Sequence, residues 1–171
     1  MSHHQDNPVR EAILRRVAPI DVQPFDRGDD SPLDWSDLGY LSQGLAWANR
    51  PLSESTKAVT ERHDLGPRGA WMLNLIAGGV CFPHELSEVF GIGKSLISAD
   101  LSRLTEAGLI TSKPAADDKR RTELALTPAG LAAREEIREA MAANLRQALA
   151  EFTPSQVRLM SRMLAALRGS T

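Results

Sequence analysis

The stretch from residue 83 to residue 127 most constrains how this chain of 171 residues can fold. Pro83 favours the start of a short helix, and the Gly-Ile-Gly segment at 91–93 favours a tight turn after it. A second helix is predicted from 94 to 107, because Gly108 is the residue type that commonly follows a helix end. Two helices joined by such a short turn form a helix-turn-helix.

The helix predicted at 94–107 has two different sides. Ile97, Leu101 and Leu104 recur at i, i+4 and i+7, which is the spacing of a side that packs on a core. The opposite side carries small or polar residues, namely Ser95, Ser98, Ala99 and Ser102. Because this second side has no large apolar residue, we expect it to be available for hydrogen bonding.

Two short strands are predicted after these helices, at 109–113 and 122–127, where the residues suit a strand. The tip between them, 114–121, collects two acids and three bases, namely Asp117, Asp118, Lys119, Arg120 and Arg121. A helix-turn-helix followed directly by a hairpin is a winged helix. We therefore predict a mainly α fold with a small β-hairpin wing, in which residues 64–127 form the winged helix-turn-helix.

The residues before this winged helix fall into two parts. Residues 1–33 are expected to form a partly irregular extension that contains a short helix at 8–17. Residues 34–63 are expected to hold N-terminal dimerisation helices. Leucines at helical spacing predict the first of these from 35 to 49, and Pro51 is expected to break or kink the chain after it.

The residues after the winged helix, 128–171, are predicted to form two helices. Thr127 and Pro128 suit the N-cap and first position of a long helix, and "TPSQ" at 153–156 has the spacing of a capping box. The long helix would span about 35 Å, more than a compact winged helix can cover. We therefore expect the terminal helices to pack against a second copy in a homodimer; the alternative is a single-chain bundle beside the winged helix.

The composition excludes several classes of protein. Hydrophobic residues make up 42% of the chain and charged residues 25%, and no apolar run reaches the roughly 18 residues of a membrane span. The N-terminus lacks the apolar core of a secretory signal, so we expect a cytoplasmic protein without a membrane partner. The single cysteine, Cys81, is expected in a short strand beside the wing as a small hydrophobe, the alternative being an oxidant sensor.

Neither a catalytic nor a metal-binding pattern stands out in the sequence. Ligand spacing is missing among the four histidines, which are His3, His4, His63 and His84. The "GIGKS" segment at 91–95 lacks the glycine spacing of a phosphate-binding loop. We therefore expect no enzyme activity, no cofactor and no metal site.

The order of these elements and two stretches of sequence resemble the MarR family of bacterial transcription regulators. "DDKRRTELALTPAG", residues 117–130, is similar to that family's wing and the helix start after it. "LSRLTEAGLI", residues 101–110, is similar to the end of its recognition helix and the first wing strand. The resemblance covers about Trp35 to Arg168. It implies a dimeric regulator, a ligand-responsive repressor, that binds double-stranded DNA at a pseudo-palindromic operator; a winged-helix module that binds protein instead remains the alternative.

The resemblance also implies which residues contact DNA. It assigns helix 94–107 to the major groove and the tip 114–121 to the minor groove, where Arg120 would insert with Asp118 as its brace. Lys119 and Arg121 would then lie near phosphates. The major-groove candidates are Lys94, Ser95, Ser98, Ser102 and Arg103.

One departure from the family's pattern concerns the recognition helix. Ala99 stands where many members carry an arginine, and Asp100, which follows it, would repel phosphate if it faced DNA. We expect Asp100 to turn sideways toward a protein partner. The stretch from Lys94 to Arg121 holds six cations and four acids, a local charge of +2 against −2 for the chain.

The resemblance further implies a pocket for a small aromatic effector between the dimerisation helices and the DNA-binding part. The aromatic residues that could line it are Trp35, Tyr40, Trp47 and Trp71. Aromatic residues at helical spacing also occur as ordinary core residues, so both interpretations stay open at this point.

Overall fold

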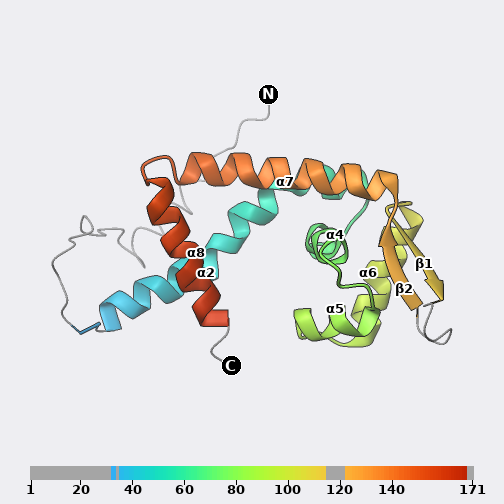
Figure 1. The fold of residues 1–171 in the computed structure, drawn as a ribbon, viewed down its shortest axis with the longest axis horizontal. Coiled ribbons are helices and arrows are strands. Elements are labelled where there is room, and N and C mark those ends of the chain that lie inside the picture. The colour runs from blue at the N-terminus through green and yellow to red at the C-terminus, as the bar shows by residue number, and fades with distance from the viewer. Residues whose placement is uncertain (1–31, 34, 115–121, 169–171) are drawn as a thin grey trace, which may run out of the picture. The chain divides into compact units, whose positions relative to one another are not determined.

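The computed structural model describes residues 32–33, 35–114 and 122–168. In these residues the chain forms seven helices, α2 to α8, and one two-stranded antiparallel sheet (Figure 1). The mainly helical class with a small hairpin is therefore confirmed. The chain divides into two compact units, Met1–Asn49 and Arg50–Thr171. Of the extension predicted at 1–33, residues 1–31, which include its short helix, lie outside the described residues.

Helix α2, Trp35–Ser55, begins in the first unit and contains Pro51 within its length. The break or kink expected at Pro51 does not end this helix, because a proline removes one main-chain hydrogen bond of the ladder and the neighbouring turns can continue it. The helix ends at Ser55 instead. There the hydroxyl of Ser55 donates to the Leu52 carbonyl at 2.7 Å and that of Thr56 to the Ser53 carbonyl at 3.0 Å. Side-chain bonds of this kind compete with the main-chain ladder.

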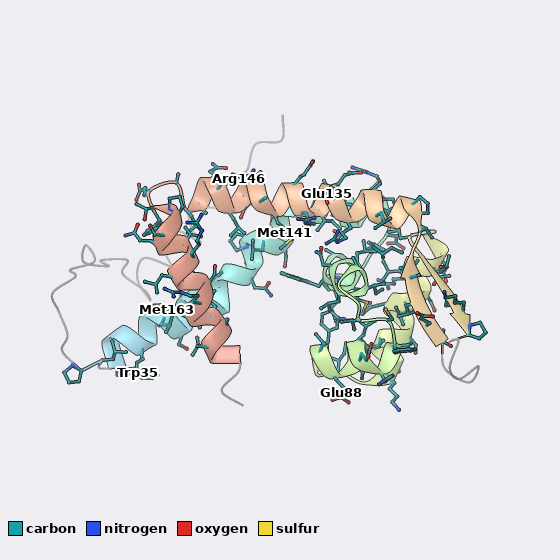
Figure 2. The ribbon with its side chains drawn as sticks, in the orientation of Figure 1. Trp35, Glu88, Glu135, Met141, Arg146 and Met163 are labelled. Atoms are coloured by element: carbon teal, nitrogen blue, oxygen red, sulfur yellow. The ribbon has the colours of Figure 1, made fainter. Side chains whose placement is uncertain are left out.

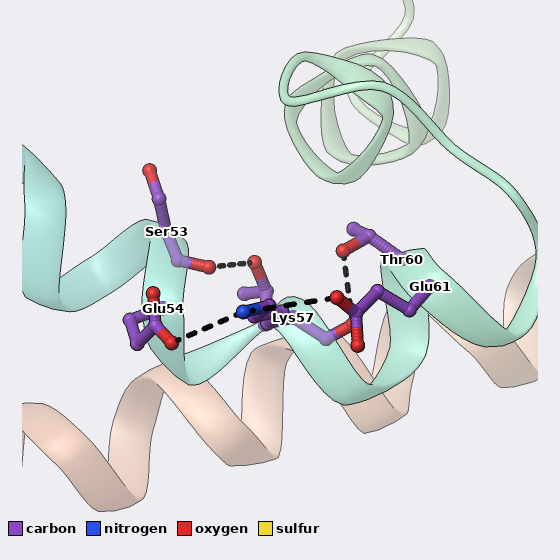
Figure 3. Close-up of polar contacts among 6 residues, drawn as sticks. Ser53, Glu54, Lys57, Thr60 and Glu61 are labelled. Atoms are coloured by element: carbon purple, nitrogen blue, oxygen red, sulfur yellow. Dashed lines mark hydrogen bonds and ion pairs between the residues drawn. The ribbon is translucent and has the colours of Figure 1, made fainter. Parts of the chain in front are cut away.

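Helix α3, Lys57–Arg62, follows this junction directly. Figure 3 shows Lys57 between two carboxylates, with its Nζ 3.6 Å from Glu54 Oε1 and 3.7 Å from Glu61 Oε1. All three side chains are exposed, so these pairs contribute little stability. A shorter ion pair joins α3 to the helix that follows the hairpin, with Arg62 Nη1 2.7 Å from Glu136 Oε2.

The core of the second unit is built by α4 (Gly69–Ala77), α5 (Pro83–Phe90), α6 (Lys94–Glu106) and the hairpin, with further residues from α3 and from the helix that follows the hairpin. Its largest fully buried side chains are Met72, Leu73, Leu86, Ile97, Leu104, Leu109, Ile110 and Ile137. On α5, Leu86 is fully buried whereas Val89 is 57% exposed. In a helix of only eight residues the turn that packs on α6 accommodates one fully buried apolar residue, Leu86.

The hairpin consists of β1, Ile110–Pro114, and β2, Thr122–Leu126. Its register pairs Ile110 with Leu126 at one end and Pro114 with Thr122 at the other. The strand expected around Cys81 is reduced to one hydrogen bond, from the Leu124 amide to the Cys81 carbonyl at 2.7 Å. In the described part of the chain the sheet therefore has two strands, and Cys81 is half-buried at its edge.

Helix α7, Pro128–Ala148, starts as the sequence predicts. The Thr127 hydroxyl accepts from the Gly130 amide at 3.0 Å and donates to the Gly108 carbonyl at 2.7 Å. The same side chain therefore caps α7 and ties it to the turn between α6 and β1. A Cβ at Gly130 would overlap the carbonyl oxygen of Leu109, so this close approach requires glycine.

Helix α8, Pro154–Arg168, begins at the predicted capping box. The Thr153 amide donates to Gln156 Oε1 at 2.8 Å, and the Gln156 amide donates to the Thr153 hydroxyl at 3.3 Å. Among the helices that the structure describes, α8 included, none combines the length and apolar character that a membrane crossing requires.

Candidate nucleic-acid interface

Helix α6 presents the two sides that its sequence predicts. Ile97 and Leu104 are almost fully buried, and Leu101 is 9% exposed. The serine face, defined as Ser95, Ser98, Ala99 and Ser102, is exposed along the other side. Gly91, in the left-handed conformation at φ 61°, makes the turn that brings α6 across α5. This geometry gives the chain an exposed helix side of small hydroxyl residues held by a buried apolar side.

A groove runs between α6 and the strands of the hairpin. It comprises two adjoining hollows of ≈ 280 and ≈ 350 Å³, which share Pro83, Ser98 and Thr122 in their linings. The other lining residues that carry polar groups are His84, Lys94, Ser102, Thr105, Glu106 and Ser112. The hairpin groove, as we call it, is therefore continuous with the serine face, and five of its thirteen lining residues carry a hydroxyl group.

The sequence missed Ser112 and Thr122 as site residues. A signal for Thr122 was present in the strand alternation, because Thr122 and the buried Leu124 are two residues apart on one strand and share a face. Thr122 therefore continues the core face of β2 to the point where it meets α6. His84 was known from the sequence but had no expected role; it lies exposed at the start of α5 and stacks on Phe82 with ring centroids 5.8 Å apart.

The hairpin tip lies outside the described residues, and with it Asp118, Lys119, Arg120 and Arg121. The structure does describe where this segment is attached. Pro114 and Thr122 pair with each other at the end of the sheet, and Thr122 lines the hairpin groove. The two described residues that flank the tip therefore lie at one end of the sheet, and one of them, Thr122, lines the groove beside α6.

The cations predicted at the margins of α6 are in place. Lys94, at the first position of the helix, lines the hairpin groove, and Arg103, in the last turn, is exposed. Lys113 is partly neutralised, because its Nζ lies 3.7 Å from Glu123 Oε2 on the paired strand. The described surface around α6 is therefore only weakly basic.

Asp100 turns sideways, as expected, but its partner belongs to the same chain. Arg68 Nε donates to Asp100 Oδ2 at 2.7 Å, and the Asp100 side chain is only 8% exposed. The expected contact with another protein is therefore wrong for this residue. The carboxylate neither faces the solvent side of α6 nor remains available to a partner, so it does not support the alternative of a protein-binding module.

Three of the four expected effector residues lie on α2, and the fourth, Trp71, lies on α4. Trp35 and Trp47 of α2 are 79% and 40% exposed, and Trp71 of α4 is 38% exposed. Tyr40 also belongs to α2, but its side chain is not among those described. A different hollow, open and of ≈ 750 Å³, lies along α7, where Figure 2 shows Glu135, Met141 and Arg146. None of the four aromatic candidates is among its lining residues.

In the described ranges no group of three His, Cys, Asp or Glu residues could hold a metal ion.

Comparisons with known proteins agree with this geometry. Residues 63–121 match the model of the MarR family. A MarR family transcriptional regulator from Rhodococcus sp. RHA1 is 17% identical with a TM-score of 0.64, over 82% of this chain and 100% of that one. The YusO protein from Bacillus subtilis is 20% identical with a TM-score of 0.55, over 80% and 95% of the two chains.

One similar structure contains nucleic acid. A cysteine-to-serine mutant of MarR from E. coli, complexed with operator DNA, is 20% identical with a TM-score of 0.61, over 80% of this chain and 99% of that one. At these identities the similarity establishes the fold. A search of curated protein sequences gave no match.

Proposed function

We propose that this chain, which has the winged-helix fold of MarR family regulators and matches the family's model over residues 63–121, is a DNA-binding transcriptional regulator. The observation that carries the proposal is the exposed serine face of α6 lying beside the hairpin groove and the attachment points of the charged tip. The structural similarity to MarR bound to operator DNA supports it. A winged helix uses such an arrangement to contact base edges and backbone together.

In this proposal α6 enters the major groove and Ser95, Ser98 and Ser102 contact base edges. Serine hydroxyls both donate and accept, so they bind several bases with little discrimination. Lys94 and Arg103 lie at the margins of the face, where phosphate groups would pass. We also assign backbone contacts to Thr122 and Ser112, because their side chains line the hairpin groove next to α6.

The hairpin tip supplies the second contact in this proposal. Arg120 would insert into the minor groove, whose negative potential is enhanced where it is narrow. Asp118 would restrict the arginine before binding, and Lys119 and Arg121 would lie near phosphates. The attachment of the tip next to the hairpin groove supports a position on the same side as the serine face.

A homodimer is the second part of the proposal. Helix α8 exposes a continuous apolar stripe, with Met160, Met163 and Leu167 at 47%, 58% and 52%. In the first unit, α2 exposes Leu38, Leu41 and Leu45 at similar spacing, 42%, 49% and 40%. Contiguous exposed apolar residues of this extent mark interaction surfaces. Two-fold symmetry would require a pseudo-palindromic operator with half-sites about one helical turn, roughly 34 Å, apart.

Regulation by a ligand is the third part. We propose that the protein represses transcription in the cytoplasm and releases its operator when a small aromatic effector changes the separation of the two α6 helices. The exposed indole rings of Trp35, Trp47 and Trp71 support an aromatic ligand, because they are free to stack on one. Effector release is tested by adding simple phenolic acids to the protein–DNA complex.

The test of DNA binding uses a duplex selected by the protein from a random library. Its affinity is measured across a salt series beside an unrelated duplex of the same length. We expect the logarithm of the binding constant to fall steeply and linearly with the logarithm of salt concentration, as counterions are released. If no duplex is enriched and none binds at low salt, DNA binding is refuted and the protein-binding module becomes the better interpretation.

A further inference from the structure

The ion pair between Arg68 and Asp100 joins two elements that are 32 residues apart. Arg68 is the N-cap residue of α4, and Asp100 lies in the middle of α6. Their side chains are 31% and 8% exposed, so the contact is closed on the side of the carboxylate and open on the side of the guanidinium. The positions of both residues are unusual, because arginine is uncommon at an N-cap and a buried aspartate is uncommon in the middle of a helix.

An arginine at the N-cap of α4 does not cap the helix. N-cap residues are usually short oxygen-bearing side chains that accept from the first free amides, whereas Arg68 makes no such bond. Its side chain reaches across to α6 instead. The chain therefore forgoes a capping contact at α4 and places a cation against the middle of α6.

Asp100 lies on the inward side of α6, next to the buried Leu101. A buried charge without a partner is strongly unfavourable, so the carboxylate depends on the guanidinium. The other oxygen is also enclosed, since a Cβ at Gly66 would lie only 3.2 Å from Asp100 Oδ1. The same Cβ would lie 3.4 Å from Arg103 Nη1. The loop before α4 therefore packs closely on one flank of α6.

We propose that Arg68 and Asp100 are positioning residues that fix the rotation of α6 about its own axis, and so set the direction in which the serine face points. This inference rests on the proposed binding of DNA by α6. Serine side chains are short, so their hydrogen bonds tolerate little rotation. A rotation of about 20° moves an atom about 4 Å from the helix axis by about 1.4 Å, which is enough to break a hydrogen bond.

The pair has a second consequence for DNA binding. Asp100 is the acid nearest the centre of α6, and an unpaired carboxylate there would oppose phosphate groups. Pairing with Arg68 removes that charge from the surface, while the guanidinium remains partly open to solvent. Loss of the positioning contact would weaken DNA binding, whereas loss of the negative charge would strengthen it. A variant without the carboxylate therefore tests the inference.

The first experiment compares Asp100→Asn and Arg68→Gln with the parent on the selected duplex and on an unrelated one. Removing a negative charge should by itself tighten binding to both duplexes. If the pair positions α6, the effect of its rotation exceeds the effect of the removed charge. We therefore expect Asp100→Asn to bind the selected duplex about tenfold more weakly, with no weakening on the unrelated duplex. The double variant should be no weaker than the weaker single variant, because the second change removes a partner already lost.

Glu136→Gln is the matched control. The Arg62–Glu136 pair has the same 2.7 Å separation, joins α3 to α7, and does not involve α6. We expect this variant to keep the parent's ratio of affinities for the two duplexes. The inference is overturned if Asp100→Asn keeps that ratio too, or binds both duplexes more tightly. If the parent itself binds no duplex, the proposed function fails first and the inference with it.

The second experiment measures amide hydrogen exchange in the DNA-free protein, so it does not depend on finding a duplex. Loss of the pair should speed exchange in α6 and in the loop before α4, and leave the protected amides of α7 unchanged. If α6 exchanges as in the parent, the positioning role is refuted even when DNA binds. Arg68→Lys, which keeps the charge but loses the Nε contact, replaces Asp100→Asn in both experiments if that variant does not fold.

Discussion

Replacing Gly130 by alanine should destabilise the protein, although alanine is normally the better helix residue. Gly130 lies in the first turn of α7, where its amide donates to the Thr127 hydroxyl. A methyl group there would overlap the Leu109 carbonyl oxygen and lie 2.9 Å from the carbonyl carbon. Both atoms belong to the main chain, so no side-chain rotation can relieve the overlap. The start of α7 must instead move away from the turn between α6 and β1.

The size of the effect follows from the contacts that this movement breaks. Thr127 makes two of them, from its amide to the Leu109 carbonyl at 3.0 Å and from its hydroxyl to the Gly108 carbonyl at 2.7 Å. Their loss costs about 1 kcal/mol each, and overpacking adds about 2 kcal/mol. The intrinsic preference of a helix for alanine returns about 1 kcal/mol. We therefore expect the free energy of unfolding to fall by about 3 kcal/mol, or the melting temperature by about 6–12 °C.

Thermal and urea denaturation followed by circular dichroism measures this change. Gly44→Ala is the matched control, because Gly44 also lies in a helix and a Cβ there would meet nothing within 4 Å. This substitution should raise the free energy of unfolding by about 0.5–1 kcal/mol. If Gly130→Ala melts at or above the temperature of the parent, the close approach at Leu109 does not constrain the fold and the reasoning is wrong.

Three further substitutions test other parts of the molecule. Arg120→Ala should weaken binding to the selected duplex by about tenfold or more while sedimentation still reports a dimer; unchanged affinity would show that Arg120 does not enter the minor groove. Met163→Glu places a charge on the exposed stripe of α8 and should convert the dimer to monomer in light scattering at micromolar concentration; a variant that stays dimeric would exclude this stripe from the interface. Leu104→Ala removes a fully buried side chain of α6 and should lower the free energy of unfolding by about 2–5 kcal/mol, and a loss below about 1 kcal/mol in denaturant titration would contradict the core assignment.

The features that could be predicted from the sequence are those that depend on residues close together in the chain. Thr127 and Pro128 start α7, and the Thr153–Gln156 pair starts α8, because capping involves residues three positions apart. The two sides of α6 follow from helical spacing in the same way. The hairpin strands were located to within one residue, since glycine and proline mark their ends.

The features that sequence could not supply depend on distant contacts. The partner of Asp100 is Arg68, 32 residues earlier, and nothing in the local pattern of either segment indicates the other. The need for glycine at position 130 comes from the main chain at Leu109, which only the folded arrangement brings close. The break expected at Pro51 does not occur, because α2 continues on both sides of the proline. Cys81 offers one carbonyl to Leu124 where a full strand was expected.

The fixed attachment of α7 at its first turn has a mechanical consequence. The helix has 21 residues and is therefore about 30 Å long, and one end is fastened to the hairpin base through Thr127 and Gly130. A sideways shift of about 5 Å at the free end then corresponds to a tilt of only about 10° at the fastened end. A displacement at the C-terminal end of α7 therefore reaches the base of the hairpin as a small rotation.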